Sequence, residues 1–245
     1  ACKASSAPDL LPAAAREPAA NAPGSATPAA SSTPTSQGPI RMEVLDAAAS
    51  PPVFVMRGSP RGAGHLVFLH GMCGHGLGYA QAFQFSAAKL GTLIAPQADV
   101  SCGGVWSKWS NDVAALDARI EATFRALGDG SALDDVWILG MSQGATRAAA
   151  LARKFPQRYT HLVSMDAPSA IAPGDLRTLR AAVLMAGERD RHDLMRASER
   201  ALRASGVPSL YLVIPEAGHG AMGPVPEQTM GLALAFLRDN ARVAP

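Results

Sequence analysis

The stretch "DDVWILGMSQGATRAAALARKF", residues 134–155, joins an apolar run to a small-residue helix through a serine set between glycines. The run "VWILG" predicts a strand that is buried on both faces. The segment "ATRAAALARKF" predicts a helix that ends before Pro156. Ser142 then lies on a sharp strand-to-helix turn, where G-x-S-x-G sequences present a nucleophile. The alternative interpretation is an ordinary serine in a glycine-flanked turn.

Strand-like and helix-like segments alternate on both sides of this turn, which predicts an α/β fold with a mostly parallel sheet covered on both faces. Two short runs at 40–45 and 52–57 predict an antiparallel start. Further strands are expected at 65–71, 91–97, 160–168, 181–190 and 209–220, and helices at 83–90, 111–128, 145–155, 195–206 and 227–241. Ser110 is expected to cap the helix at 111–128, and Gly128 to end it.

Composition divides the chain into two parts. Residues 1–39 consist mainly of Ala, Pro, Ser and Thr and predict a disordered linker, whereas residues 40–245 predict one catalytic domain. The net charge of +2, without a basic stripe, argues against nucleic-acid binding. No apolar run reaches the ~18 residues of a membrane span. The opening Ala1-Cys2 resembles the start of a mature bacterial lipoprotein, which predicts lipidation of Cys2 and a membrane anchor; the alternative is a free tail thiol.

A serine nucleophile needs a base and an orienting acid. His219 lies at the carboxyl end of the last predicted strand segment, 209–220, where active sites form in parallel sheets. Asp190 ends the strand before it, in "AGERD", so the order Ser142, Asp190, His219 fits this type of turn. His192 is the competing base, and Asp166 is the alternative acid.

The reaction also needs N–H donors for the developing oxyanion. The residue after the nucleophile, Gln143, is expected to supply one amide, and Met72 in the glycine-rich loop "HGMCGHG" the other. His70 is expected to fix that loop by hydrogen bonding. The set His70, Cys73 and His75 could also be interpreted as metal ligands, but the spacing is weak and no fourth ligand is evident.

The domain from about 40 to 243 resembles an α/β-hydrolase, on the motifs "LHGMCGHG", "GMSQGA", "AGERD" and "GHG" in that order. "GMSQGA" is similar to the nucleophile turn of the small carboxylesterase, acyl-protein thioesterase and dienelactone hydrolase branches. The resemblance implies a Ser-His-Asp triad of Ser142, His219 and Asp190, oxyanion donors at Met72 and Gln143, and no cofactor or metal.

Two departures from that pattern carry further expectations. Only about fifteen residues, 168–182, separate two strands where lids are commonly inserted, so the site should be open. In this superfamily the strands before Cys73 and Cys102 usually lie side by side, which predicts a disulfide; free thiols are the alternative. A disulfide would fit the extracytoplasmic location that the lipoprotein-like tail suggests. Trp106 and Trp109 either line the substrate cleft or only cover the sheet edge.

Together these features predict an esterase that acts on small-molecule, short-chain or compact esters. A serine peptidase or an acyltransferase could use the same residues, because leaving-group preference depends on the shape of the pocket. A binding protein that has lost catalysis on this fold is the alternative of another class. The sequence predicts no oligomeric state.

Overall fold

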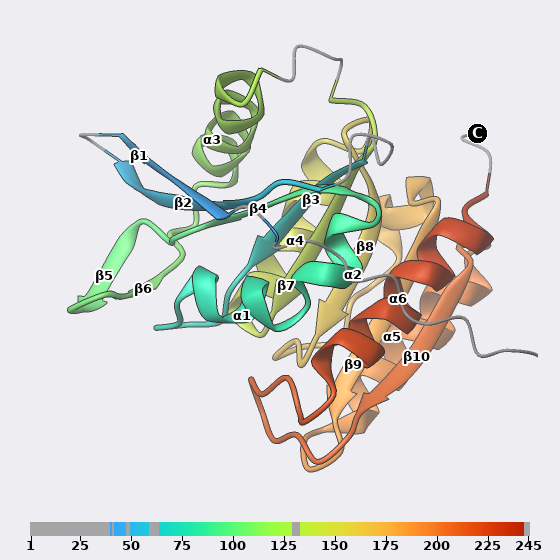
Figure 1. The fold of residues 1–245 in the computed structure, drawn as a ribbon. Helices are drawn as coiled ribbons and strands as arrows, with labels where there is room; N and C mark the ends of the chain where they lie inside the picture. The colour runs from blue at the N-terminus through green and yellow to red at the C-terminus, as the bar shows by residue number, and fades with distance from the viewer. Residues whose placement is uncertain (1–39, 41, 48–49, 59–63, 129–132, 243–245) are drawn as a thin grey trace, which may run out of the picture. The chain divides into compact units, whose positions relative to one another are not determined.

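The structure of the protein, a computed structural model, describes residues 40, 42–47, 50–58, 64–128 and 133–242. An eight-stranded sheet forms its centre (Figure 1). Its strands are β1 (Met42–Ala47), β2 (Ser50–Met56), β3 (Gly64–Leu69), β4 (Gly91–Pro96), β7 (Val136–Met141), β8 (Tyr159–Met165), β9 (Ala181–Gly187) and β10 (Ser209–Ile214). They lie in the order β1-β2-β4-β3-β7-β8-β9-β10. All neighbours from β4 to β10 are parallel, whereas β2 pairs antiparallel with β1 and β4, so the predicted sheet and its antiparallel start are confirmed.

Helices cover both faces of this sheet. They are α1 (Gly76–Ala82), α2 (Gln84–Ala88), α3 (Val113–Ala126), α4 (Gln143–Lys154), α5 (His192–Ala204) and α6 (Pro226–Asn240). Helices α3, α4 and α5 share one hydrophobic cluster with the sheet, and α1, α2 and α6 share the other. Strand β3 shows why its run is apolar throughout: Val67 and Leu69 enter the first cluster, and Leu66 and Phe68 the second.

The start of α3 differs from the prediction. Its N-cap is Asp112, whose carboxylate accepts from the Ala115 amide at 2.9 Å. Ser110 lies two residues earlier and accepts from the Asp112 amide at 3.3 Å, so the expectation that Ser110 caps the helix is wrong. Both side chains are good N-cap acceptors, and Asp112 stands at the spacing that reaches the third helical amide. Gly128 follows the helix with φ 81°, as expected for its end.

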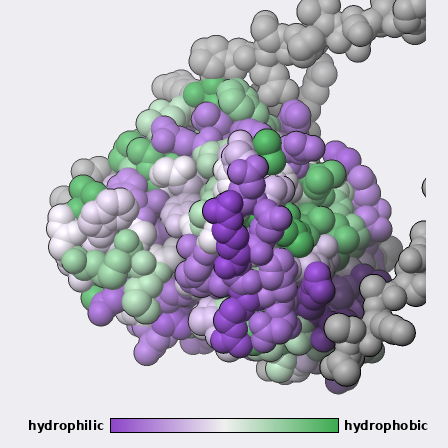
Figure 2. Space-filling view, turned by 90° about the horizontal axis from the view of Figure 1, so that it is seen from below, coloured by the Kyte–Doolittle hydropathy of each residue, from purple (hydrophilic) through white to green (hydrophobic). Residues whose placement is uncertain are grey.

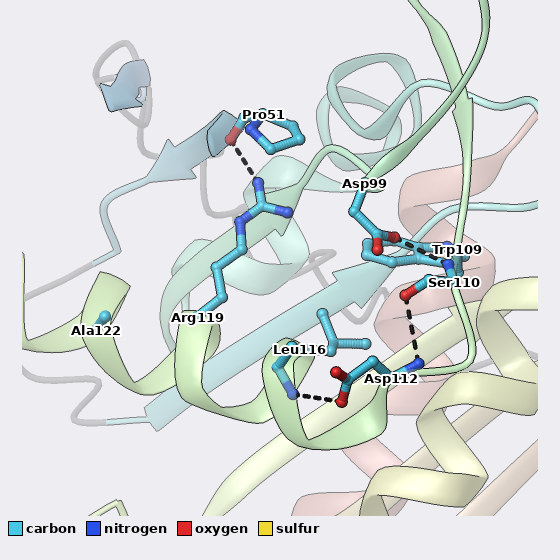
Figure 3. Close-up of a pocket in the computed structure, with 9 residues that line it drawn as sticks. Pro51, Asp99, Trp109, Ser110, Asp112, Leu116, Arg119 and Ala122 are labelled. Atoms are coloured by element: carbon cyan, nitrogen blue, oxygen red, sulfur yellow. Dashed lines mark hydrogen bonds between the residues drawn. The ribbon is translucent and has the colours of Figure 1, made fainter. Parts of the chain in front are cut away.

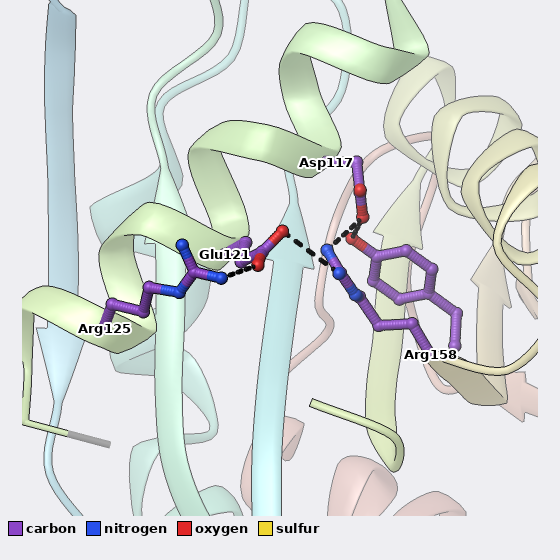
Figure 4. A network of polar contacts seen from close by, with 5 residues as sticks. Asp117, Glu121, Arg125 and Arg158 are labelled. Atoms are coloured by element: carbon purple, nitrogen blue, oxygen red, sulfur yellow. Dashed lines mark hydrogen bonds and ion pairs between the residues drawn. The ribbon is translucent and has the colours of Figure 1, made fainter. Parts of the chain in front are cut away.

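A polar network ties α3 to the first residue of β8 (Figure 4). Arg158 donates to Asp117 at 2.9 Å and to Glu121 at 3.1 Å, and the Tyr159 hydroxyl donates to Asp117 at 2.7 Å. Burial raises the pKa of Tyr159, so its hydroxyl keeps its proton and remains a donor. Glu121 also pairs with Arg125 one helical turn later.

Three features were not predicted from the sequence. A hairpin of β5 (Val100–Gly103) and β6 (Trp106–Lys108) follows β4, α1 precedes α2, and α5 begins three residues earlier than expected. The connection from β8 to β9 contains only the 3-10 turn η1 (Gly174–Thr178), so the expected absence of a large lid at this position is confirmed.

Residues 1–39 lie outside the described residues, and with them the predicted linker and the predicted lipidation of Cys2. Among the helices that the structure describes, none has the length and apolarity to cross a membrane.

Candidate active site

Ser142 lies between β7 and α4 in a backbone conformation that side chains rarely adopt, with φ 51° and ψ −114°. Its two flanking glycines are required by space. A Cβ at Gly140 would lie 2.4 Å from the Gly144 carbonyl oxygen, and a Cβ at Gly144 would lie 2.0 Å from the Leu69 carbonyl oxygen. Strained backbone of this kind concentrates at functional sites. The turn therefore presents Ser142 at the carboxyl end of β7.

The Ser142 side chain contacts a histidine, and that histidine contacts a carboxylate. Ser142 Oγ lies 2.9 Å from His219 Nε2, and His219 Nδ1 lies 2.7 Å from Asp190 Oδ2. Asp190 follows β9 and His219 follows β10, so all three residues come from the carboxyl ends of parallel strands. In the tautomer that satisfies both contacts, Nδ1–H donates to Asp190 and Nε2 accepts from the Ser142 hydroxyl. The structure thus brings together the three residues predicted as the triad.

The charge of Asp190 suits the orientation of a histidine. Burial opposes ionisation of Asp190, but hydrogen bonds from His219 and from the Arg191 amide hold its pKa below the usual value. Asp190 is therefore an anion at neutral pH and can stabilise a positive charge on the ring. The His219 side chain is 52% exposed, which leaves the ring accessible to a substrate.

Asp166, the alternative acid, lies beside the triad and is only 3% exposed. Its two oxygens accept from the Gly187 amide at 2.8 Å and from the Gly220 amide at 3.1 Å. Burial raises the pKa of Asp166, and the neighbouring Asp190 carboxylate raises it further. Asp166 therefore holds the loop that carries His219. Asp166, Asp190 and His219 offer possible ligand atoms within 4.8 Å of one another, but these side chains are engaged by the hydrogen bonds just described.

Other groups considered from the sequence are engaged elsewhere. His192 Nδ1 lies 2.6 Å from the Tyr211 hydroxyl, and its Nε2 lies 2.9 Å from the Glu188 carbonyl oxygen. His192 is therefore not the base of Ser142. Cys73 is bonded in a disulfide and both ring nitrogens of His70 have partners, which removes two of the three candidate metal ligands of that loop.

The loop predicted to supply an oxyanion donor contains a tight turn beside the nucleophile. The Gly74 amide donates to the Gly71 carbonyl oxygen at 3.1 Å, and Cys73 between them has φ 49°. A Cβ at Gly71 would lie 3.5 Å from the Ser142 Cβ, so this turn abuts the serine. Gln143 is the first residue of α4. The assignment of the Met72 and Gln143 amides as oxyanion donors remains a prediction.

His70 and Trp109 hold this loop in place by hydrogen bonds to its backbone. His70 Nε2 accepts from the Ala98 amide at 3.0 Å, so its Nδ1 carries the proton and donates to the Gly71 carbonyl oxygen at 2.8 Å. The Trp109 indole donates to the His70 carbonyl oxygen at 2.7 Å. The backbone of Trp109 pairs with the side-chain amide of Gln143, at 3.0 and 3.2 Å. Trp109 is 4% exposed and its indole is engaged with the backbone of this loop, so of its two alternatives the structure favours a covering role over contact with substrate.

The burial of His70 makes the stability of the fold depend on pH. Burial lowers the pKa of His70 from 6.5 to about 4. The unfolded chain therefore binds the proton more readily between these values, and the stability conferred by neutral His70 is lost as the pH falls through this window. From pH 7 to pH 4.5 the expected loss is about 2 kcal/mol. We expect His70→Gln, whose oxygen can still accept from the Ala98 amide, to lack this component, as measured by urea unfolding at both pH values.

The control for this prediction is His75→Gln, which removes a partly exposed imidazole from the same loop. Carboxylates titrate in the same pH range, so the decisive quantity is the difference between wild type and variant in the loss of unfolding free energy. An equal loss in wild type and His70→Gln would show that His70 is not held neutral by burial.

The loop is also tied to the β5–β6 hairpin. A disulfide joins Cys73 to Cys102, as predicted, with 5.6 Å between their Cα atoms. Gly74 and Ser107 exchange two backbone hydrogen bonds. The buried Gln97 amide donates to the Gly74 carbonyl oxygen at 3.0 Å and to Ser107 Oγ at 2.7 Å. Nothing in the sequence marks Gln97 for this role beyond its place at the end of a predicted strand.

A cavity lined by none of Ser142, Asp190 and His219 lies between the loop after β4 and helix α3 (Figure 3). Its volume is about 450 Å³. Asp99 accepts there from the Ser110 amide at 2.9 Å, and Arg119 donates to the Gln97 carbonyl oxygen at 2.7 Å. Arg119 also donates to the Pro51 carbonyl oxygen, as Figure 3 shows. The charged groups of this cavity therefore hold loops together.

Three solved structures with a similar fold are named as hydrolases. The predicted CIB-like hydrolase of Thermoplasma acidophilum is 19% identical with a TM-score of 0.61, over 82% of this chain and 99% of that one. Carboxylesterase CesB of Bacillus subtilis is 14% identical with a TM-score of 0.60, over 81% and 92%. The fluorophosphonate-binding serine hydrolase F of Staphylococcus aureus is 14% identical with a TM-score of 0.57, over 82% and 99%.

No protein-family model matches the chain, and no curated protein sequence matches it significantly. The structural likenesses lie below 20% identity and therefore show the fold. The chain has the α/β-hydrolase fold, as its motifs predicted.

Proposed function

We propose that the protein is a serine esterase that hydrolyses carboxylic esters through Ser142, His219 and Asp190. The observation that carries this proposal is the chain of contacts of 2.9 and 2.7 Å from the strained serine turn to the histidine and the carboxylate. The names of similar structures, among them a carboxylesterase, support the same chemistry. The half-exposed His219 opens to solvent, so a small-molecule ester can reach the site.

The geometry accounts for each proton transfer of ester hydrolysis. Ser142 Oγ attacks the carbonyl carbon while His219 Nε2 removes its proton, and Asp190 stabilises the imidazolium that forms. The Met72 and Gln143 amides are assigned to the developing oxyanion. The ester C–O bond then breaks, and His219 returns the proton to the leaving alcohol. Water that His219 activates cleaves the acyl-enzyme and restores Ser142. These steps use side chains and amides of the chain itself.

We also infer an extracytoplasmic location. A disulfide between Cys73 and Cys102 supports this inference, because such bonds persist mainly in oxidising compartments.

The proposal is tested with an alkyl fluorophosphonate probe, which forms a bond to an activated serine oxygen with loss of fluoride. We expect peptide mass spectrometry to find the adduct on Ser142 in the wild type. Ser142→Ala should show no adduct, and His219→Ala should react far more slowly because the hydroxyl loses its base. Hydrolysis of 4-nitrophenyl acetate should disappear with the labelling.

Ser169→Ala is the matched control, because Ser169 is an exposed serine in the connection between β8 and β9. The Ser169→Ala variant should react with the probe and hydrolyse 4-nitrophenyl acetate as the wild type does. A folded wild type that does not label would contradict the esterase proposal and favour a binding function on this fold. Labelling without ester hydrolysis would favour a peptidase or an acyltransferase instead.

A further inference from the structure

An apolar groove of about 680 Å³ adjoins the candidate active site. Its walls come from the turn after β3, from α1, from the tip of the β5–β6 hairpin and from the loop after His219. The side chains that define it are Met72, Leu77, Tyr79, Val105, Trp106 and Met222. Its volume falls within the ~300–1,000 Å³ of ordinary ligand sites.

Contacts to both sides of the triad place the groove next to the nucleophile. Met72, in its wall, follows Gly71, whose Cβ position would lie 3.5 Å from the Ser142 Cβ. At the other side the Tyr79 hydroxyl donates to the Gly220 carbonyl oxygen at 2.7 Å, directly after His219. A group bound in the groove therefore lies between the turn that contains Met72 and the loop that contains His219.

The groove selects for apolar groups. None of the residues that line it is Asp, Glu, Lys or Arg. Met72, Val105 and Trp106 are 62%, 64% and 53% exposed, so their apolar surface is available for a ligand to cover. The surface seen in Figure 2 is mostly hydrophilic, with apolar residues in separate patches. Exposed apolar residues that gather at one place on such a surface mark binding sites.

The wall that carries Val105 and Trp106 is held in position before any ligand binds. The disulfide, the Gly74–Ser107 backbone pair and the Gln97 amide fix the hairpin against the turn after β3. Gln97 also donates to the Val105 carbonyl oxygen at 3.0 Å. A wall fixed in this way lowers the ordering cost of binding an apolar group.

We propose that this groove binds an extended, uncharged apolar arm of the ester, so that the enzyme prefers esters with such an arm to acetates of small alcohols. The inference rests on the proposed esterase function and extends it beyond compact esters. The arm belongs either to the acyl group or to the alcohol. Two substrate series distinguish these sources: 4-nitrophenyl esters from acetate to octanoate, and acetates from methyl to octyl.

In the series whose arm occupies the groove, kcat/KM should rise with chain length in the wild type. The measured quantity is the ratio of kcat/KM for the longest substrate of the series to kcat/KM for the shortest. Trp106→Ala should lower this ratio by about tenfold, because the substrate's alkyl arm loses the contacts of a few methylene groups. Gly78→Leu should lower the same ratio by filling the groove, because a Cβ at Gly78 meets nothing within 4 Å. Leu232→Ala, which removes an exposed leucine from α6, should leave the ratio unchanged.

A binding measurement separates this inference from the proposed function. On the Ser142→Ala background, 4-nitrophenyl octanoate and octyl acetate are titrated calorimetrically with and without Trp106→Ala. We expect about tenfold weaker binding of one of them without the indole. Fluorophosphonate labelling of the wild type reports independently on the triad. The groove is not a substrate site if two results are found together: the kcat/KM ratios of both series are unchanged in Trp106→Ala and Gly78→Leu, and Trp106→Ala binds both ligands as tightly as its parent. This conclusion would hold whatever the labelling shows.

Discussion

Asp190→Asn is expected to lower kcat for ester hydrolysis by about 10⁴-fold while the fold remains intact. The amide can still contact His219, but its NH₂ group would face Nδ1 and leave the ring proton on Nε2, toward Ser142. In that tautomer the ring cannot accept the proton of the serine hydroxyl. The amide also carries no charge to stabilise the imidazolium. The measurement is kcat with 4-nitrophenyl acetate, with thermal unfolding as the check on folding.

Asp166→Asn is the matched control, because it makes the same chemical change in the neighbouring carboxyl group. Its oxygen can still accept from the Gly187 amide, but its NH₂ group replaces the oxygen that accepts from the Gly220 amide, so one hydrogen bond to the loop after His219 is lost. We therefore expect kcat to fall by at most about tenfold, the scale of one hydrogen bond. A larger loss in Asp166→Asn than in Asp190→Asn would reverse the assignment and make Asp166 the acid of the triad.

The sequence predicted the triad geometry because local signals and topology agree at these positions. Glycines around Ser142 mark a turn, and parallel strands bring their carboxyl ends to one edge of the sheet. Once Asp190 and His219 were placed after two such strands, their proximity to Ser142 followed from the fold. The contacts of 2.9 and 2.7 Å are the consequence of that arrangement.

Tertiary contacts between distant segments could not be predicted from the sequence. The sequence leaves open whether Trp109 lines the cleft, whereas in the structure its indole is buried and donates to the His70 carbonyl oxygen, 39 residues away. Gln97 joins two loops through its side-chain amide, and nothing in the local pattern indicates such partners.

The β5–β6 hairpin, by contrast, is marked in the sequence by two adjacent glycines. Gly103 ends β5 and Gly104 begins the turn, with φ 105° and 56°. A Gly-Gly pair between short extended runs is a recognised indication of a hairpin turn. Here it would have predicted the wall that carries Trp106.

Gly144→Ala is expected to destabilise the protein by about 3 kcal/mol or more, since the new methyl group would meet backbone. Its Cβ would lie 2.0 Å from the Leu69 carbonyl oxygen and 2.6 Å from the His70 carbonyl oxygen. Neither atom can rotate away, so α4 would have to move from β3 and carry Ser142 with it. For a domain of this size the melting temperature should fall by roughly 6–12 °C. Differential scanning calorimetry and ester hydrolysis measure the two consequences.

The control for Gly144→Ala is Gly78→Ala, which adds the same methyl group inside helix α1, where nothing lies within 4 Å of it. That variant should be unchanged or stabilised by up to about 1 kcal/mol, because alanine loses less backbone entropy than glycine in a helix. The comparison separates the effect of the contact from the effect of glycine itself. If both variants melt within about 2 °C of the wild type, α4 does not approach β3 closely enough to require a glycine, since even 1 kcal/mol would shift melting by about that much. The position of Ser142 would then need another explanation than the close packing of helix on strand.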